Sequence, residues 1–136
     1  MHDQLMKATI PILTEFMPTA ELKVMTQGLF GEEADYFLKK LVETAEVINT
    51  MPKTYETDGQ GNAAIAWLHY FKNGFDWYIT EKDVDSDNEG QIQAFGLVKM
   101  YETEVGYINI RELIANGVEL DLHWTPKSLA EIKASL

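Results

Sequence analysis

Closely spaced carboxylates are the residues of this sequence best suited to chemistry, and they gather between residues 81 and 104. Seven acids and two lysines give this segment a net charge of −5 over 24 residues. Carboxylates at such density can bind a metal ion, transfer protons or present an anionic surface to a cationic partner. The acids are Glu81, Asp83, Asp85, Asp87, Glu89, Glu102 and Glu104.

Residues 83–87 carry the alternating carboxylates with which a calcium-binding EF-hand loop begins. The rest of that motif is missing, because Asn88 occupies the position of the turn glycine and Ala94 that of the bidentate glutamate. The segment also connects two predicted strands rather than two helices. We therefore expect a solvated hairpin loop here and no metal site.

A metal-dependent endonuclease acting on single-stranded DNA is an alternative function, with Glu81, Asp83 and His123 as its catalytic residues. Such enzymes hold their metal ions with clustered carboxylates. Asp121 and His123 would share one face of a strand and could form a carboxylate–imidazole pair. Against this reading, Glu81 and Lys82 point to opposite faces of a strand, so they cannot converge on one phosphate without a bulge.

Two further polar features are interpreted as structural. His69 lies among aromatic residues in a predicted strand, which is typical of a buried, hydrogen-bonded core histidine. The polar stretch Thr57–Asn62 contains two glycines but lacks the Gly-Lys-Ser/Thr of a phosphate-binding loop. We interpret this stretch as a linker.

The first fifty residues are predicted to be helical. Apolar residues recur at helical spacing from Glu32 to about Asn49 and form one stripe. A second helix is expected from a cap at Thr9 to about Met17, since Pro11 is tolerated only in a first turn. A third is expected over Ala20–Gln27, with Gly28 as its C-terminal stop.

Residues 52–136 are predicted to form a small antiparallel meander of four to five strands with a C-terminal helix. The Asn73-Gly74 pair between two aromatic and β-branched runs is a strong hairpin signal, and it places Tyr70 opposite Trp77. Asn109 is expected to cap a short helix over 111–116, and Thr125 to cap the last helix over 127–134. The fold class is α+β, one domain of residues 1–136 with helices on one side of the sheet. The predicted strands are 63–71, 75–80, 91–100, 105–110 and 120–124.

The composition of the 136-residue chain excludes several function classes. Twenty-two acids against eleven bases give a formal net charge of −11, which argues against direct nucleic-acid binding, because neutralising phosphates needs a basic face. Without cysteine there is no disulfide, thiolate nucleophile or Cys-ligated zinc. No segment approaches the ~20 apolar residues of a membrane span, and residues 1–4 lack the basic start of a secretory signal. We expect a cytoplasmic protein without a cofactor.

Five short motifs occur between residues 77 and 126, and their order is more specific than any one of them. They are Trp77-Tyr78-Ile79-Thr80-Glu81, Phe95-Gly96-Leu97, Glu104-Val105-Gly106-Tyr107, Glu112-Leu113 and Asp121-Leu122-His123-Trp124-Thr125-Pro126. In this order they resemble the domain of unknown function 2958, a bacterial family, over about residues 52–126. Val105 replaces a usual leucine, and Leu120 stands where an arginine often precedes the Asp-Leu-His.

This resemblance implies a setting rather than a mechanism. Relatives are carried by phages, plasmids and integrative elements, often near conjugation or anti-restriction genes. Some carry the label of single-stranded DNA endonuclease, without an agreed set of catalytic residues. The resemblance therefore implies mobile-element biology and assigns no catalytic residue to this chain.

The favoured function is that of an acidic accessory protein that binds and inhibits a basic, nucleic-acid-handling host protein. Duplex DNA carries one negative charge per ~1.7 Å, so a similar row of carboxylates could occupy a groove built for DNA. The acids of residues 81–104 form such a row if their two loops lie at the same end of the meander. With the setting that the resemblance implies, this predicts an anti-restriction or anti-CRISPR role.

Two other interpretations stay open. An acidic surface can serve solubility alone. The chain could also be a structural module that forms a homodimer through an exposed strand edge or through the predicted helix over 32–49.

Overall fold

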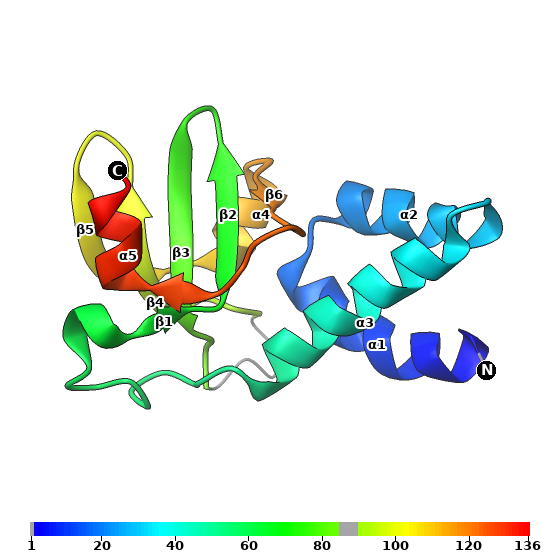
Figure 1. Ribbon diagram of the computed structural model, residues 1–136, viewed down its shortest axis with the longest axis horizontal. Coiled ribbons are helices and arrows are strands. Elements are labelled where there is room, and N and C mark those ends of the chain that lie inside the picture. The colour runs from blue at the N-terminus through cyan, green and yellow to red at the C-terminus, as the bar shows by residue number, and fades with distance from the viewer. Residues whose placement is uncertain (1, 85–89) are drawn as a thin grey trace.

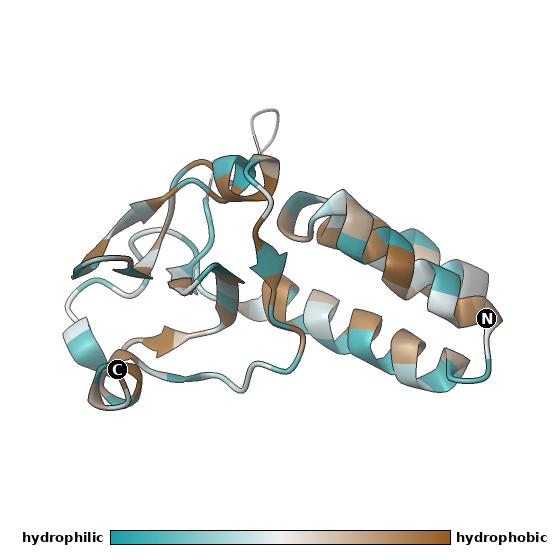
Figure 2. Cartoon of the chain, turned by 90° about the horizontal axis from the view of Figure 1, so that it is seen from above, coloured by the Kyte–Doolittle hydropathy of each residue, from teal (hydrophilic) through white to brown (hydrophobic). Residues whose placement is uncertain are grey.

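The computed structural model describes residues 2–84 and 90–136, and it places a helical N-terminal part beside a β-rich part (Figure 1). The helical part consists of α1 (His2–Phe16), α2 (Thr19–Gln27), the 3₁₀ helix η1 (Gly28–Phe30) and α3 (Ala34–Thr50). Hydrophobic positions recur along its helices (Figure 2), as expected of helices that bury one face. In the described part of the chain, no helix is long and apolar enough to cross a bilayer.

A five-stranded antiparallel sheet forms the β-rich part, in the order β5-β4-β3-β2-β6, which confirms the α+β class. Asn73 and Gly74 take φ angles of 51° and 84° and form the two-residue turn between β2 and β3, as predicted. The predicted register is confirmed, with Tyr70 opposite Trp77. The strands are β2 (Leu68–Lys72), β3 (Phe75–Glu81), β4 (Ala94–Lys99), β5 (Thr103–Ile108) and β6 (Glu119–Leu120).

The main hydrophobic core lies between the helical part and one face of the sheet. Leu13 of α1 and Leu41 of α3 are fully buried there, as are Tyr70 of β2 and Ile79 of β3. Each such side chain contributes roughly 1.5–3 kcal/mol by leaving water. The Tyr70 hydroxyl also donates a hydrogen bond to the backbone carbonyl of Phe16, which joins β2 to the end of α1.

A smaller core covers the other face of the sheet. The two-residue strand β7 (Lys127–Ser128) pairs with β1 (Ile65–Ala66) and leads directly into α5 (Leu129–Ala134). Leu129 and Ile132 of α5 pack there with Tyr78 of β3 and Leu97 of β4. Helices therefore cover both faces of the sheet, and the prediction that they lie on one side is wrong.

Several element boundaries differ from the sequence prediction. α1 already begins at His2 and contains Pro11 in its interior, a cost of about 3 kcal/mol that burial of the following helical turn offsets. The last helix begins after Ser128, whose side chain accepts a hydrogen bond from the Glu131 amide at 3.2 Å in a capping box, so the predicted cap at Thr125 is wrong. α2 ends at Gln27 and Gly28 is its C-cap, as predicted, but Gly28 takes a right-handed conformation and begins η1.

The predicted cap of the short helix α4 (Ile110–Ala115) is confirmed. The Asn109 side chain accepts a hydrogen bond from the Glu112 amide at 3.0 Å. The strand predicted over 120–124 is shorter, because only Glu119–Leu120 pairs with β2 before the chain turns.

Candidate binding site

The described acids of the two loops lie at opposite ends of the sheet, which overturns the expectation of one continuous anionic row. Glu81 ends β3, whereas Glu102 lies in the turn that follows β4, and these antiparallel strands run in opposite directions. The six residues of β4 separate the two ends by about 20 Å. The turn between β4 and β5 lies at the top of the sheet in Figure 1, and β3 ends at the bottom. The predicted residues Asp85, Asp87 and Glu89 lie outside the described residues.

Glu81 and Asp83 are buried, so they do not belong to an exposed surface. Glu81 is 3% exposed and Asp83 5% exposed. Asp83 accepts a hydrogen bond from the Gln93 amide at 2.9 Å, and its own amide donates to the Gln91 side chain at 2.6 Å. These bonds tie the segment after β3 to the segment before β4. Of the predicted binding acids described here, Glu102 and Glu104 are exposed.

The predicted Asp121–His123 side-chain pair does not form. Asp121 instead contacts Nδ1 of His69 at 3.0 Å with one carboxylate oxygen and accepts the His123 backbone N–H at 2.9 Å with the other. Nε2 of His69 lies 2.7 Å from Asp76, and its ring stacks on Tyr78 with centroids 4.7 Å apart. Both ring nitrogens are occupied by carboxylates, so His69 has the structural role expected from the sequence and no nitrogen left for a substrate.

The three residues of the endonuclease hypothesis are held in separate places. Glu81 is hydrogen bonded to the loop before β1 and Asp83 to the segment before β4, while His123 is exposed in the turn after β6. Within residues 2–84 and 90–136, no group of three or more His, Cys, Asp or Glu side chains is arranged to hold a metal ion. The geometry of this part of the chain therefore gives the nuclease hypothesis no assembled site.

A cavity of about 390 Å³ opens beside Glu81, on the sheet face that also carries α5. This volume is within the range of sites that hold small molecules or single side chains of a partner. Its walls come from the loop before β1 with the 3₁₀ helix η2 (Gly61–Ala63), from three strands and from α5. Its lining combines polar residues with apolar ones: Tyr55, Thr57, Asp58, Glu81 and Tyr107 are polar, and Ala64, Phe95, Val105 and Leu129 are apolar.

The Glu81 carboxylate is held in place by three hydrogen bonds from the loop. Its Oε1 accepts the Tyr55 amide at 2.9 Å, and its Oε2 accepts the Thr57 amide at 2.9 Å and the Thr57 hydroxyl. Tyr55 has a φ of 77°, an uncommon conformation for a residue with a side chain, which turns this loop around the carboxylate. The loop is thus built on Glu81, and its position depends on that acid.

Two tyrosines form the rim of the cavity. Tyr55 and Tyr107 are each 58% exposed, and the Tyr107 hydroxyl donates to the Tyr55 hydroxyl at 3.2 Å. This hydrogen bond raises the pKa of Tyr107 above its ordinary value of 10.0, so the Tyr107 hydroxyl keeps its proton near neutral pH. The Tyr107 ring also contacts Phe95 edge to face, with centroids 5.6 Å apart. The rim is therefore aromatic and positioned by its neighbours.

The charge of the cavity is negative. Within the described part of the chain, Glu81 forms no ion pair with a lysine or arginine. The adjacent Lys82 turns the other way, and its ammonium donates to the carbonyls of Ile48 at 2.7 Å and Asn49 at 3.2 Å, at the end of α3. Burial lowers the pKa of Lys82. Asp58, an exposed residue, is the second acid of the lining. Among the described residues, the walls of the cavity therefore carry two acids and no basic side chain.

Sequence reasoning missed most of this cavity. The stretch Thr57–Asn62, interpreted as a linker, is one of its walls. One signal in the sequence pointed to Glu81. It directly follows residues 77–80, whose side chains are aromatic, aliphatic or β-branched and therefore expected to be buried. A carboxylate at the end of such a buried strand needs hydrogen-bond donors or an opposite charge. Nothing in the spacing of Tyr55 and Tyr107 indicates that they meet.

Comparisons with protein-family models, curated proteins and solved structures find no match to this chain. The resemblance of residues 52–126 to the domain of unknown function 2958 stays a prediction. The cavity itself is therefore the basis for a proposed function.

Proposed function

We propose that this protein is a non-catalytic binding protein that takes a lysine side chain of a basic partner protein into the cavity beside Glu81. The observation that carries the proposal is the Glu81 carboxylate, which is 3% exposed, lines the cavity and has no basic partner among the described residues. A buried charge is stabilised by an opposite charge. A partner's ammonium group is the simplest group to supply it.

The hydrogen bonds of Glu81 favour lysine over arginine. A carboxylate has about four acceptor positions, and the loop fills three of them, two on Oε2 and one on Oε1. One position is left, which suits the single contact of an ammonium group. Arginine prefers two parallel hydrogen bonds to both oxygens.

The walls of the cavity fit the stem of a lysine. Ala64, Phe95, Val105 and Leu129 are apolar, and a lysine stem packs along such a surface while its charged end reaches a polar group. The aromatic rim offers ring faces that attract a passing cation. Asp58 adds a second negative charge on the lining.

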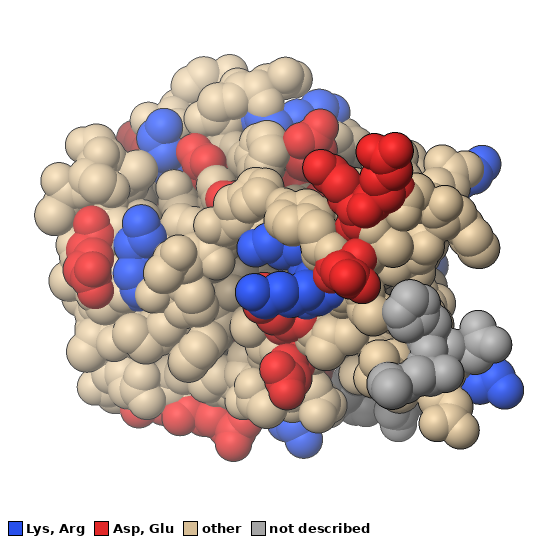
Figure 3. Space-filling view, turned by 45° about the vertical axis from the view of Figure 1, so that its right-hand side comes forward, with Lys and Arg blue, Asp and Glu red and all other residues tan. Residues whose placement is uncertain are grey.

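The charge of the whole chain supports a basic partner. A net charge of −11 steers cationic proteins toward the surface, and Figure 3 shows acidic side chains grouped on one face beside a few basic ones. Proteins that handle nucleic acid expose basic surfaces. We therefore propose a nucleic-acid-handling host protein as the partner, inhibited because this chain occupies its basic surface.

The experiment is a nuclear magnetic resonance titration of the ¹⁵N-labelled protein with acetyl-Ala-Lys-Ala-amide. We expect shifts of the Tyr55, Thr57 and Tyr107 amides, with binding about tenfold weaker for the Nε-acetyl-lysine peptide, which has lost its charge. The arginine peptide should bind more weakly than the lysine peptide. Equal binding of the acetylated peptide, or shifts confined to other regions, would refute the proposal.

Variants of the protein complete this test. Glu81→Gln should abolish the difference between the lysine and acetyl-lysine peptides, whereas Glu32→Gln removes the same charge from an exposed site just before α3 and should leave the difference unchanged. If Glu81→Gln does not fold, Val105→Lys tests the same cavity in a different way. Its side chain, 48% exposed on the cavity wall, supplies a competing ammonium and should reduce binding of the lysine peptide.

A further inference from the structure

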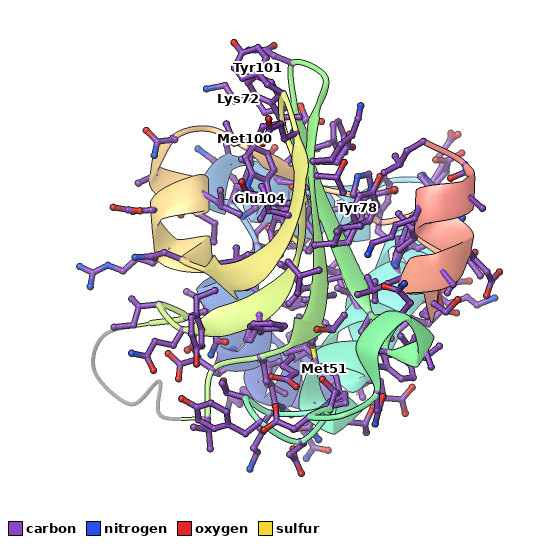
Figure 4. All side chains as sticks on the ribbon, turned by 90° about the vertical axis from the view of Figure 1, so that its left-hand side faces the viewer. Met51, Lys72, Tyr78, Met100, Tyr101 and Glu104 are labelled. Atoms are coloured by element: carbon purple, nitrogen blue, oxygen red, sulfur yellow. The ribbon has the colours of Figure 1, made fainter. Side chains whose placement is uncertain are left out.

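β5 is the last strand of the sheet, and its outer side has no strand partner among the described residues. It pairs with β4 over its whole length, from Thr103 opposite Lys99 to Ile108 opposite Ala94. In an antiparallel strand, alternate residues direct their N–H and C=O groups to one neighbour, and the others direct them to the opposite side. About half of the backbone groups of β5 therefore point outward. Figure 4 looks onto this side of the sheet, with Tyr101 at the turn and Glu104 along the strand.

The side chains of β5 leave this edge accessible. Thr103, Glu104, Val105 and Tyr107 are all exposed, so residues on both faces of the strand are in contact with solvent. Between them, Gly106 adds no side chain, and a Cβ placed there would have no atom within 4 Å. Exposed strand edges of this kind pair readily with another extended chain.

The open edge is continuous with the cavity. Val105 and Tyr107 are both residues of β5 and lining residues of the cavity. A strand that paired with β5 would place one of its side chains directly beside each of them, because opposite residues of paired strands have Cβ atoms about 4.5–5.5 Å apart. The Cβ of a lysine at such a position would lie at the mouth of the cavity, and its methylene chain would extend along the apolar walls.

We propose that the partner segment binds as an extended strand added to the free edge of β5, with a lysine directed into the Glu81 cavity. This inference rests on the proposed function and adds the conformation and sequence pattern of the ligand. Main-chain hydrogen bonds to β5 supply affinity, and the cavity selects the side chain.

The opposite face of β5 specifies a second basic residue. Glu104 alternates with Val105 and lies on the other face of the strand. The residue next to the cavity lysine in the added strand would therefore lie beside Glu104, and opposite charges at such positions are favourable. Two consecutive basic residues in an extended segment are the predicted pattern.

Charge also decides against a second copy of this chain as the occupant. Glu102 and Glu104 flank the edge, and each copy carries a net charge of −11. Pairing two such edges would bring like charges together, which is unfavourable between directly opposed residues. A basic segment would instead be attracted by the carboxylates of Glu102 and Glu104.

The test uses acetyl-Thr-Val-Lys-Lys-Val-Thr-amide and two versions of this peptide that are N-methylated on alternate residues. Each version loses the N–H groups of one edge only. We expect one version to bind at least about tenfold more weakly and the other to bind like the parent peptide, because strand addition uses a single edge. Amide hydrogen exchange of residues 103–108 should slow at alternate positions when the parent peptide is bound.

The outcomes separate this inference from the proposed function. If binding depends on Glu81 but both methylated peptides bind like the parent and exchange in β5 is unchanged, strand addition is wrong and the lysine cavity stands. If neither this peptide nor the lysine tripeptide binds, both proposals fail. Sedimentation that shows a dimer with protected β5 amides in the absence of peptide would assign the edge to a second copy and overturn the choice of partner.

Discussion

Glu21 offers the sharpest test of the described electrostatics. It lies on α2, is half-buried and accepts a hydrogen bond from the Leu120 amide at 3.0 Å. Burial raises the pKa of Glu21 from 4.5 to about 7, with further contributions from the nearby charges of Glu119 and Asp121, while the hydrogen bond from Leu120 acts in the opposite direction. The folded protein should therefore hold a proton on Glu21 at pH values at which the unfolded chain has released it.

The sign of the effect on stability follows from proton binding. Between pH 4.5 and about 7 the folded state binds more protons than the unfolded state, so stability falls as the pH rises through this window. The difference between the two pKa values corresponds to at most about 3.4 kcal/mol. Because the side chain is half-exposed and solvent screens its charge, we expect about 1–2 kcal/mol.

Glu21→Gln removes this proton linkage and keeps an acceptor for the Leu120 amide. The variant should be about as stable as the natural protein at pH 4.5 and about 1–2 kcal/mol more stable at pH 8. Urea unfolding monitored by fluorescence of the three tryptophans, at intervals of one pH unit, measures this difference. The exposed Glu32→Gln is the control. Parallel stability curves for the natural protein and Glu21→Gln would refute the reasoning.

Two further predictions concern the packing of the sheet. Gly96→Ala should lower the free energy of unfolding by more than about 3 kcal/mol in urea, because the added Cβ would overlap the Tyr78 carbonyl oxygen on the neighbouring strand. A loss below about 1 kcal/mol would contradict this packing. His69→Phe should cost about 1–3 kcal/mol, because it keeps the ring stack on Tyr78 but removes the two ring nitrogens that contact the carboxylates of Asp76 and Asp121. An additional Asp76→Asn should recover part of that loss, and a double-mutant cycle measures the recovery.

Local signals predicted local structure well in this chain. The Asn73-Gly74 turn allows positive φ at both residues, and it therefore sets the register between β2 and β3. The cap at Asn109 was predictable for the same reason, since its partner is three residues away. The predicted cap at Thr125 is wrong, because the Ser128–Glu131 box satisfies both the helix amide and the cap amide at the start of the last helix.

The candidate site depended on contacts that no local pattern reports. Glu81 receives its hydrogen bonds from Tyr55 and Thr57, which are 26 and 24 residues away, so its burial could not be read from its neighbours. The anionic row failed for a topological reason. In a meander, successive turns alternate between the two ends of the sheet, so Glu81 and Asp83 before β4 are kept apart from Glu102 and Glu104 after it. The predicted meander therefore already implied this separation, and the observed strand order shows it.

The position of α5 has a consequence for how the chain folds during synthesis. The strands that carry Tyr78 and Leu97 leave the ribosome well before Leu129 and Ile132, which are the residues that cover them. Until then that apolar surface is available to chaperones and to other nascent chains. The packing of α5 onto the sheet is therefore a late, long-range step. Slow translation of the codons for α5 would lengthen the time during which this apolar surface is exposed.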